Sequence, residues 1–189
     1  MSTEIAAHSM AVSLPVEIAL DLMASRINQV SGPARLVAVD PVHMWAGRLR
    51  LPGIVGQAPS SRFMRIMHLF PKAEQADDPA LFEQLANGGR IGILISGQLA
   101  PIVARIRQQS SDEQTPILHG IARKHGLRLI EECGIGGPRS IVWAAFARAA
   151  EQAARPDLQD RFEFRYRRAL APTPGTQASL LTVLVLERP

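Results

Sequence analysis

A glycine-rich turn stands directly before an apolar helix in the stretch "CGIGGPRSIVWAAFARAA". A helix begins with backbone N–H groups that have no intrahelical partner, and its macrodipole is positive at that end. Glycines let a ligand approach the backbone closely, and an arginine adds a bidentate charged contact. We therefore predict that this turn binds a phosphate group. The residues that would form the site are Gly134, Gly136, Gly137, Arg139 and Ser140.

The same turn has a purely structural alternative. It is not a Walker A loop, which requires G-x-x-x-x-G-K-[ST]. It also fails the dinucleotide fingerprint G-x-G-x-x-G, because Arg139 occupies the sixth position. In the alternative, the glycines only satisfy the backbone geometry of a bend between a strand and a helix. The local sequence leaves both interpretations open.

Two carboxylates, Glu131 and Glu132, stand just before the glycine turn. Carboxylates bind divalent cations such as Mg²⁺, and a bound cation activates water for attack on phosphorus. Adjacent residues of a strand point to opposite faces, so at most one of the two faces a common site. The alternative is a surface carboxylate at the end of a strand.

Basic residues form two clusters that a phosphate backbone would attract. The first contains Arg123, Lys124 and Arg128. The second contains Arg165 and Arg167, which would project from the same face of a strand together with Arg161. We predict DNA contacts from Arg123, Lys124, Arg128, Arg165 and Arg167. A solvated face with no ligand is the alternative for the second cluster.

The composition is that of a soluble globular domain. The chain has 189 residues, of which 47% are hydrophobic and 20% charged, and its formal net charge is +4. One cysteine, Cys133, excludes an intramolecular disulfide and suits a reducing cytoplasm. No apolar run approaches the ~20 residues that a membrane-spanning helix needs. We therefore expect a cytoplasmic protein without a membrane span.

Hydrophobic periodicity and turn residues predict an α+β fold. We expect helices over residues 15–30, 78–89, 115–126 and 139–154, with Asp78 as the cap of the second. We expect strands over residues 34–40, 47–56, 61–70, 101–106 and 127–132, followed by a C-terminal hairpin of residues 161–170 and 178–188. The apolar run at 90–96 fits either a helix or a strand. A mixed β-sheet flanked by helices would form one compact domain over residues 1–189.

Two stretches, in this order, resemble the ParB/sulfiredoxin superfamily. "SGQLAPIVARI" is similar to the family's G-x-x-x-P followed by an apolar strand, with Gly97 and Pro101 in the motif positions. "RLIEECGIGGPRSIVWAAFARA" is similar to a strand, then G-x-x-R, then an alanine-rich helix, with Gly136 and Arg139 in the motif positions. The resemblance covers about residues 78–150. It implies a ParB/sulfiredoxin-like fold that binds a nucleotide or DNA phosphate at the start of the helix.

Departures from the family pattern narrow this resemblance. Pro138 stands where sulfiredoxin has its catalytic cysteine, and too few residues follow the helix for the additional domains of a partition protein. What is left is similar to plasmid fertility inhibitors of the oncogenic-suppressor type, which block transfer of plasmid DNA or T-DNA by a conjugation-type secretion system.

That branch implies a DNase with associated ATPase activity, using ATP and Mg²⁺ or another divalent cation as cofactors. Glu131, Glu132 and Arg139 would be catalytic, and Glu131 and Glu132 would bind the metal. The partners would be DNA and secretion or coupling proteins. The alternatives are a non-catalytic inhibitor that binds a component of the transfer machinery, and a DNA-binding regulator.

Overall fold

We describe the protein from a computed structural model. The structure describes residues 2–38, 62–71, 75, 77–100, 102, 120–175 and 178–189, with only the backbone for residues 2–13. The chain divides into two compact units. The first contains Met1–Ala19, Ser96–Asp112 and Cys133–Thr182, and the second contains Leu20–Ile95, Glu113–Glu132 and Val183–Pro189.

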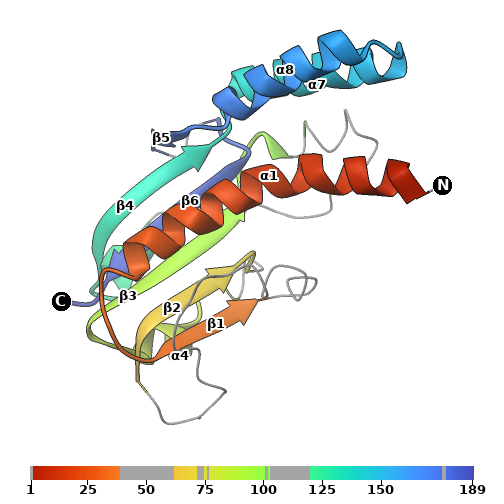
Figure 1. The fold of residues 1–189 in the computed structure, drawn as a ribbon. Helices are drawn as coiled ribbons and strands as arrows, with labels where there is room; N and C mark the ends of the chain where they lie inside the picture. Colours follow the sequence, from red (N-terminus) through yellow and green to blue (C-terminus); the bar gives the residue numbers. More distant parts are fainter. Residues whose placement is uncertain are drawn as a thin grey trace. The chain divides into compact units, whose positions relative to one another are not determined.

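Helices and strands alternate along much of the described chain (Figure 1). The helices are α1 (Ser2–Ile27), α4 (Pro79–Glu83), α6 (Ile121–Lys124), α7 (Pro138–Gln152) and α8 (Pro156–Ala169). The strands are β1 (Ala34–Ala38), β2 (Phe63–Leu69), β3 (Leu85–Ser96), β4 (Arg128–Ile135), β5 (Pro172–Pro174) and β6 (Leu181–Glu187). They form one six-stranded sheet in the order β1-β2-β3-β6-β4-β5.

The sheet is mixed. β1 pairs with β2 in parallel, and β2 pairs with β3 in parallel, so that His68 lies beside Val37 on one side and Ile93 on the other. β5 pairs antiparallel with β4. Gly88 N, near the start of β3, donates to Arg188 O, just after the end of β6, and the end of β3 pairs with the start of β6. β6 therefore runs antiparallel to β3. Because β1, β2 and β3 are parallel to one another, their carboxyl ends lie at the same edge of the sheet.

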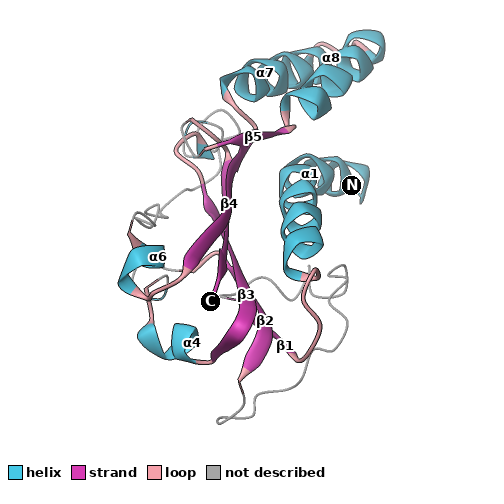
Figure 2. Ribbon diagram, turned by 90° about the vertical axis from the view of Figure 1, so that its left-hand side faces the viewer, coloured by secondary structure: helices cyan, strands magenta, loops and turns pink. Residues whose placement is uncertain are grey.

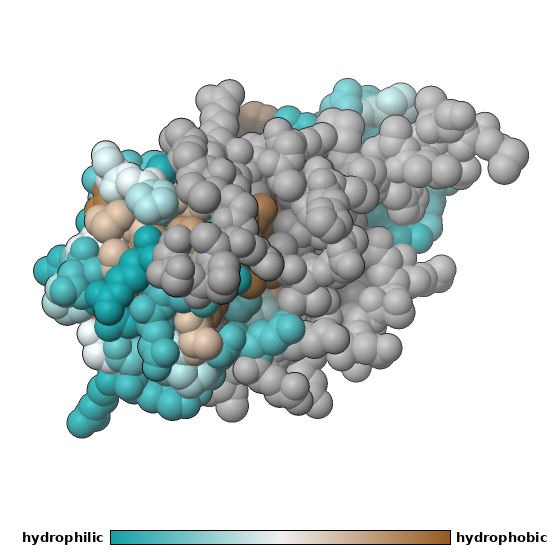
Figure 3. Space-filling model, turned by 90° about the horizontal axis from the view of Figure 1, so that it is seen from below, coloured by the Kyte–Doolittle hydropathy of each residue, from teal (hydrophilic) through white to brown (hydrophobic). Residues whose placement is uncertain are grey.

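Helices cover both faces of the sheet in the second unit (Figure 2). On one face, the C-terminal part of α1 packs so closely that a Cβ at Gly92 would lie 2.4 Å from Met23 Cγ. On the other face, α4 and α6 contribute Phe82 and Ile121 to the hydrophobic core. The other core members are Phe63, Ile66, Leu81, Leu85, Ile91, Ile93, Ile95, Leu127, Leu184 and Leu186. The described surface seen in Figure 3 is mostly hydrophilic, with small apolar areas.

Burial on both faces explains the apolar run at residues 90–96. A strand covered on both sides needs apolar side chains at nearly every position instead of alternating ones. The run is therefore strand, as part of β3. The preceding helix begins as predicted, since Asp78 accepts a hydrogen bond from Ala80 N at 3.0 Å. Its predicted end at residue 89 is wrong, because Leu85 already pairs with Phe63 of β2.

In the first unit, α7 and α8 pack against each other through aromatic rings. The ring centroid of Phe162 lies 5.4 Å from that of Phe146 and 6.0 Å from that of Trp143. Arg165 Cζ lies 4.7 Å from the Trp143 ring centroid, at a distance typical of cation–π contacts. Aromatic and cation–π contacts thus hold α7 and α8 together.

Helix α8 corrects the predicted first strand of the C-terminal hairpin at residues 161–170. The sequence predicts a strand here, in which successive side chains point to opposite faces. Buried and half-buried apolar residues instead recur every four positions, at Leu158, Phe162, Tyr166 and the C-cap Leu170, which is the spacing of one helix face, whereas Phe164 is exposed. Pro156 also fits the first turn of a helix. The prediction that Arg161, Arg165 and Arg167 share one face is therefore wrong, because residues 161 and 167 lie about 240° apart around a helix.

Other predicted elements have mixed outcomes. Predicted strands at 34–40, 61–70, 127–132 and 178–188 are confirmed as β1, β2, β4 and β6, and α7 confirms the helix at 139–154. The first helix begins at Ser2 instead of at residue 15. In α7, the apolar residues Val142 and Phe146 are 50% and 49% exposed, so they do not form a buried face. The predicted strand at 47–56, most of the strand at 101–106, and residues 115–119 of a predicted helix lie outside the described residues.

None of the helices in the described part of the chain has the length and apolar character needed to cross a membrane. The single domain over residues 1–189 stays a prediction.

Candidate functional site

A pocket of about 190 Å³ opens in the second unit, between α4 and the edge of the sheet at β1 and β2. Its lining combines charged, polar and apolar side chains: Arg35, Val37, His68, Gln75, Asp78, Ala80, Leu81 and Gln84. Val37 and His68 are the next-to-last residues of β1 and β2. The pocket therefore lies beside the carboxyl ends of two parallel strands.

His68 is the most deeply buried polar group of this pocket. The residue is 2% exposed, and its Nδ1 atom has no hydrogen-bond partner among the described residues. Burial lowers the pKa of His68 from 6.5 to about 4, partly opposed by the nearby Asp78 carboxylate and slightly assisted by Arg35. The imidazole is therefore neutral at pH 7, with one ring nitrogen available to a ligand.

Arg35 and Asp78 give the pocket one charge of each sign. Arg35 projects from β1 and donates from Nη1 to Gln84 Oε1, while its guanidinium carbon lies 5.8 Å from the Phe63 ring centroid. Asp78 caps α4 through its contact with Ala80 N. These contacts hold both charged groups in place. Each group uses only part of its hydrogen-bonding capacity, so each can still bind a ligand.

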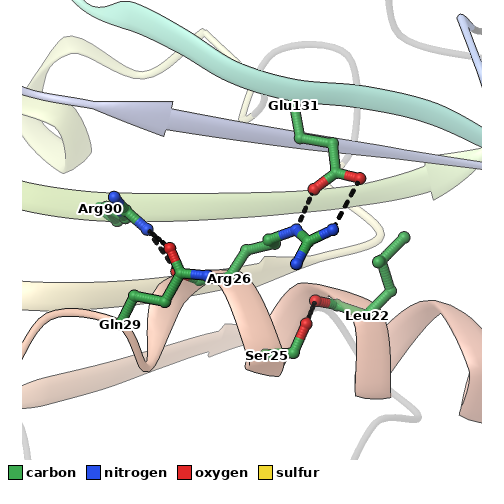
Figure 4. A network of polar contacts seen from close by, with 6 residues as sticks. All are labelled: Leu22, Ser25, Arg26, Gln29, Arg90 and Glu131. Atoms are coloured by element: carbon green, nitrogen blue, oxygen red, sulfur yellow. Dashed lines mark hydrogen bonds and ion pairs between the residues drawn. The ribbon is translucent and has the colours of Figure 1, made fainter.

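The predicted catalytic residue Glu131 takes part in an ion pair on the α1 side of the sheet (Figure 4). Arg26 Nε donates to Glu131 Oε2, and Arg26 Nη2 lies 3.5 Å from Oε1. The predicted DNA contact Arg128 likewise pairs with Glu187, which also accepts from Arg90 Nε at 2.9 Å. Together these pairs connect α1, β3, β4 and β6, a structural role that accounts for their charges.

The other predicted DNA contacts belong to both units, with Arg123 and Lys124 in the second and Arg165 and Arg167 in the first. Lys124 pairs with Asp77, which also lies 2.7 Å from His125 Nε2. Arg123 is exposed at the end of α6. Arg165 covers Trp143, and Arg167 is exposed on α8. A role for each of these residues in binding DNA stays a prediction.

The glycine turn after β4 serves close packing. A Cβ at Gly134 would lie 2.6 Å from Ser179 Cβ, and one at Gly136, where φ is +73°, would lie 2.8 Å from Leu180 Cδ1. Gly137 caps α7, and the buried Ser140 Oγ donates to its carbonyl at 2.6 Å. Arg139 is exposed in the first turn of α7. These contacts match the bend interpretation, and phosphate binding by this turn stays a prediction.

Glu132 is half-buried on β4. The described residues include no group of three or more His, Cys, Asp or Glu side chains arranged to hold a metal ion. The sequence interpretation missed His68, Arg35 and the second role of Asp78 in the pocket. Its one available signal was a lone histidine inside the apolar run "FMRIMHLF".

No family model and no curated protein matches this chain. Solved structures do match most of its length. A chain from the complex between the Haloferax volcanii Trm112 methyltransferase activator and a methyltransferase is 13% identical, with 89% of this chain and 87% of that chain covered and a TM-score of 0.51. A cyclopropane synthase from Mycobacterium tuberculosis is 10% identical, with 88% and 82% covered and a TM-score of 0.43.

The first of these matches shows a Rossmann-like fold of the methyltransferase type. The predicted ParB/sulfiredoxin-like fold is therefore wrong, and so is the resemblance to plasmid fertility inhibitors. The reason lies in the short motifs that suggested it. Gly97 and Gly136 are needed for close packing, since a Cβ at Gly97 would lie 2.2 Å from Ser179 O. Pro101 lies outside the described residues.

The functions derived from that resemblance are corrected with it. The DNase, the ATPase, and the block on plasmid or T-DNA transfer have no support in the methyltransferase-type fold. The ATP and Mg²⁺ predictions rested on the same resemblance and are wrong with it. A coclaurine N-methyltransferase among the similar structures, 8% identical with 91% of this chain and 70% of that chain covered and a TM-score of 0.45, is bound to S-adenosylhomocysteine (SAH). DNA and secretion proteins as partners likewise lack support.

Proposed function

We propose that this protein is a methyltransferase that uses S-adenosylmethionine. The observation that carries this proposal is the likeness, at a TM-score of 0.51 over 89% of the chain, to a chain from a methyltransferase complex. Folds host many functions, so the proposal also needs a suitable site. In α/β sheets, ligands bind outside the carboxyl ends of the parallel strands.

The pocket beside β1 and β2 occupies such a position. His68 and Val37 line it one residue before their strands end. Phe70, which follows β2, has a φ of +48°, a strained conformation for a residue with a side chain. Strained backbone persists where the surrounding structure enforces it, and it gathers at ligand-binding sites. Both features support a functional role for this edge of the sheet.

The size of the pocket favours a ligand smaller than the whole cofactor. Pockets for drug-sized ligands span roughly 300–1,000 Å³, whereas this pocket has about 190 Å³. It therefore fits a small acceptor or one end of the cofactor, and not a whole nucleoside cofactor. We assign no binding site among the described residues to the nucleoside part of the cofactor.

S-adenosylmethionine, when bound, supplies a methyl group on a positively charged sulfur. The residues of this pocket would bind and orient the acceptor. Arg35 would pair with a negative group of the acceptor, and Asp78 with a positive one. His68 would remain neutral and hydrogen-bond a polar atom of the acceptor through Nδ1.

We also propose a cytoplasmic location. The chain contains one cysteine, Cys133, which excludes an intramolecular disulfide. Such a composition suits a reducing compartment.

Calorimetric titration of SAH into the purified chain tests the proposed function, with ATP as the control nucleotide. We expect SAH to bind and ATP not to bind. At a concentration 100 times its dissociation constant, SAH should add about 2.7 kcal/mol to the free energy of unfolding and raise the melting temperature by roughly 5–10 °C. A folded protein that binds neither SAH nor S-adenosylmethionine at millimolar concentration would refute the proposal.

A further inference from the structure

We infer that the pocket formed by Arg35, His68 and Asp78 binds a small zwitterionic amino acid. The first observation is the state of His68, a side chain almost wholly removed from solvent with Nδ1 unpartnered among the described residues. A buried polar atom without a hydrogen bond costs about 1–3 kcal/mol. A ligand that hydrogen-bonds Nδ1 would remove this cost, so the pocket is suited to a polar occupant.

The charges of the pocket select the class of ligand. The Arg35 guanidinium can bind a carboxylate with two parallel hydrogen bonds, and its contact with Gln84 restricts its orientation. The Asp78 carboxylate lies close enough to His68 to influence its protonation, and it would attract an ammonium group. With His68 neutral, the two charges cancel.

Balanced charges disfavour the competing classes of ligand. A phosphate or a dicarboxylate would bring its excess negative charge close to Asp78, and a simple amine would bring its positive charge close to Arg35. A zwitterion satisfies both residues and leaves no net charge in a partly buried site. Its ammonium group or a side-chain hydroxyl can donate to His68 Nδ1.

The remaining lining limits the size of the ligand. Val37, Ala80 and Leu81 provide apolar surface, and the amides of Gln75 and Gln84 provide further hydrogen-bonding groups. The volume of about 190 Å³ leaves room for a short side chain beside the two charged groups. This binding requires no methyl transfer, so the inference and the proposed function can succeed or fail separately.

Titration of the full-length protein with L-alanine tests the inference, with the ring signals of His68 followed by NMR. Alaninamide, which lacks the carboxylate, and propionate, which lacks the ammonium group, are the matched probes. We expect L-alanine to bind at least about tenfold more tightly than either, because each analogue leaves one charged partner unmatched. Equal affinity for all three probes, or no change in the His68 signals at tens of millimolar, would overturn the inference.

Variants locate the binding to the pocket. Arg35→Met should weaken the binding of L-alanine at least about tenfold and also weaken the binding of propionate, but not that of alaninamide, which has no carboxylate for Arg35 to bind. Asp78→Asn should have a similar effect on L-alanine while retaining the helix cap, because asparagine is also a good N-cap residue. Glu131→Gln, on the other face of the sheet, is the control and should bind L-alanine normally. Wild-type affinity in both pocket variants would overturn the inference.

A final titration distinguishes a free amino acid from the amino-acid end of SAH. We infer a ligand that is separate from the cofactor, so we expect L-alanine to bind equally well in the presence of saturating SAH. Displacement of L-alanine by SAH would overturn its assignment as a separate ligand.

Discussion

In the second unit, an ion-paired network on one face of the sheet and a pocket on the other face differ in how their polar groups are paired. On the α1 side, the carboxylates of Glu131 and Glu187 have arginine partners that tie together distant segments. On the α4 side, His68 is buried with one nitrogen unpartnered among the described residues. A satisfied ion pair is explained by structure alone, whereas an unsatisfied buried atom needs a further reason. The difference directs the search for function away from the carboxylates and toward the histidine.

The largest effect we expect comes from acidification acting on His68. Between pH 6.5 and about pH 4, the unfolded chain binds a proton at His68 that the folded chain does not bind. The free energy of unfolding should therefore fall as the pH is lowered through this window, by up to about 3 kcal/mol. Urea unfolding near neutral pH and near pH 4.5 measures this fall.

His68→Gln is the matched variant, since glutamine is polar and does not titrate. Its free energy of unfolding should fall less over the same window, because other groups alone then contribute. Equal falls in the variant and the wild type would show that His68 is not held neutral by burial, and the contrast between the two faces would disappear.

The next effect concerns Glu187, whose side chain is 12% exposed between two arginines. Its pairing with Arg90, and then with Arg128, lowers the pKa of Glu187 below its ordinary 4.5. The carboxylate therefore stabilises the fold above about pH 4.5, and this contribution is lost as the pH falls further.

Glu187→Gln should lower the free energy of unfolding at pH 7 by about 2 kcal/mol, because two guanidinium groups lose a charged partner. Chemical denaturation measures the change. Glu163→Gln on α8 is the control and should change stability by no more than about 0.5 kcal/mol. A loss as small as the control's would mean that the network contributes little to the fold.

A smaller effect is expected for Glu131→Gln. The pair with Arg26 is partly solvated, with side chains 25% and 39% exposed, so its loss should cost only about 0.5–1 kcal/mol. Salt should reduce this cost. Unfolding measured at low and high ionic strength checks both points. A much larger loss of stability would mean that the ion pair behaves as a buried one.

Local signals predicted much of the secondary structure. Asp78 located the start of α4, and the glycine turn before residue 139 located the start of α7 to within one residue. Short segments failed where tertiary pairing decided the outcome, as at Leu85, which joins the sheet through Phe63. The period of α8 was misread because charged residues between Phe162 and Tyr166 imitate the alternation of a strand.

The fold family and the candidate site were not predictable from the same signals. A glycine that permits close packing and a glycine that admits a phosphate look alike in a sequence. Glu131 was chosen for its place beside the glycine turn, but its partner Arg26 is 105 residues away. The pocket likewise joins β1, β2 and α4, so its residues share no local motif.

Transfer of tritiated methyl groups from S-adenosylmethionine to a mixture of small amino acids would test the central claim most directly. The measurement compares the wild type with His68→Phe, which fills the pocket, and with Glu131→Gln, after circular dichroism has shown that all three are folded. We predict transfer by the wild type and by Glu131→Gln, and a loss of at least about tenfold in His68→Phe. Loss of transfer in Glu131→Gln with full activity in His68→Phe would contradict the account and place the chemistry on the ion-paired face.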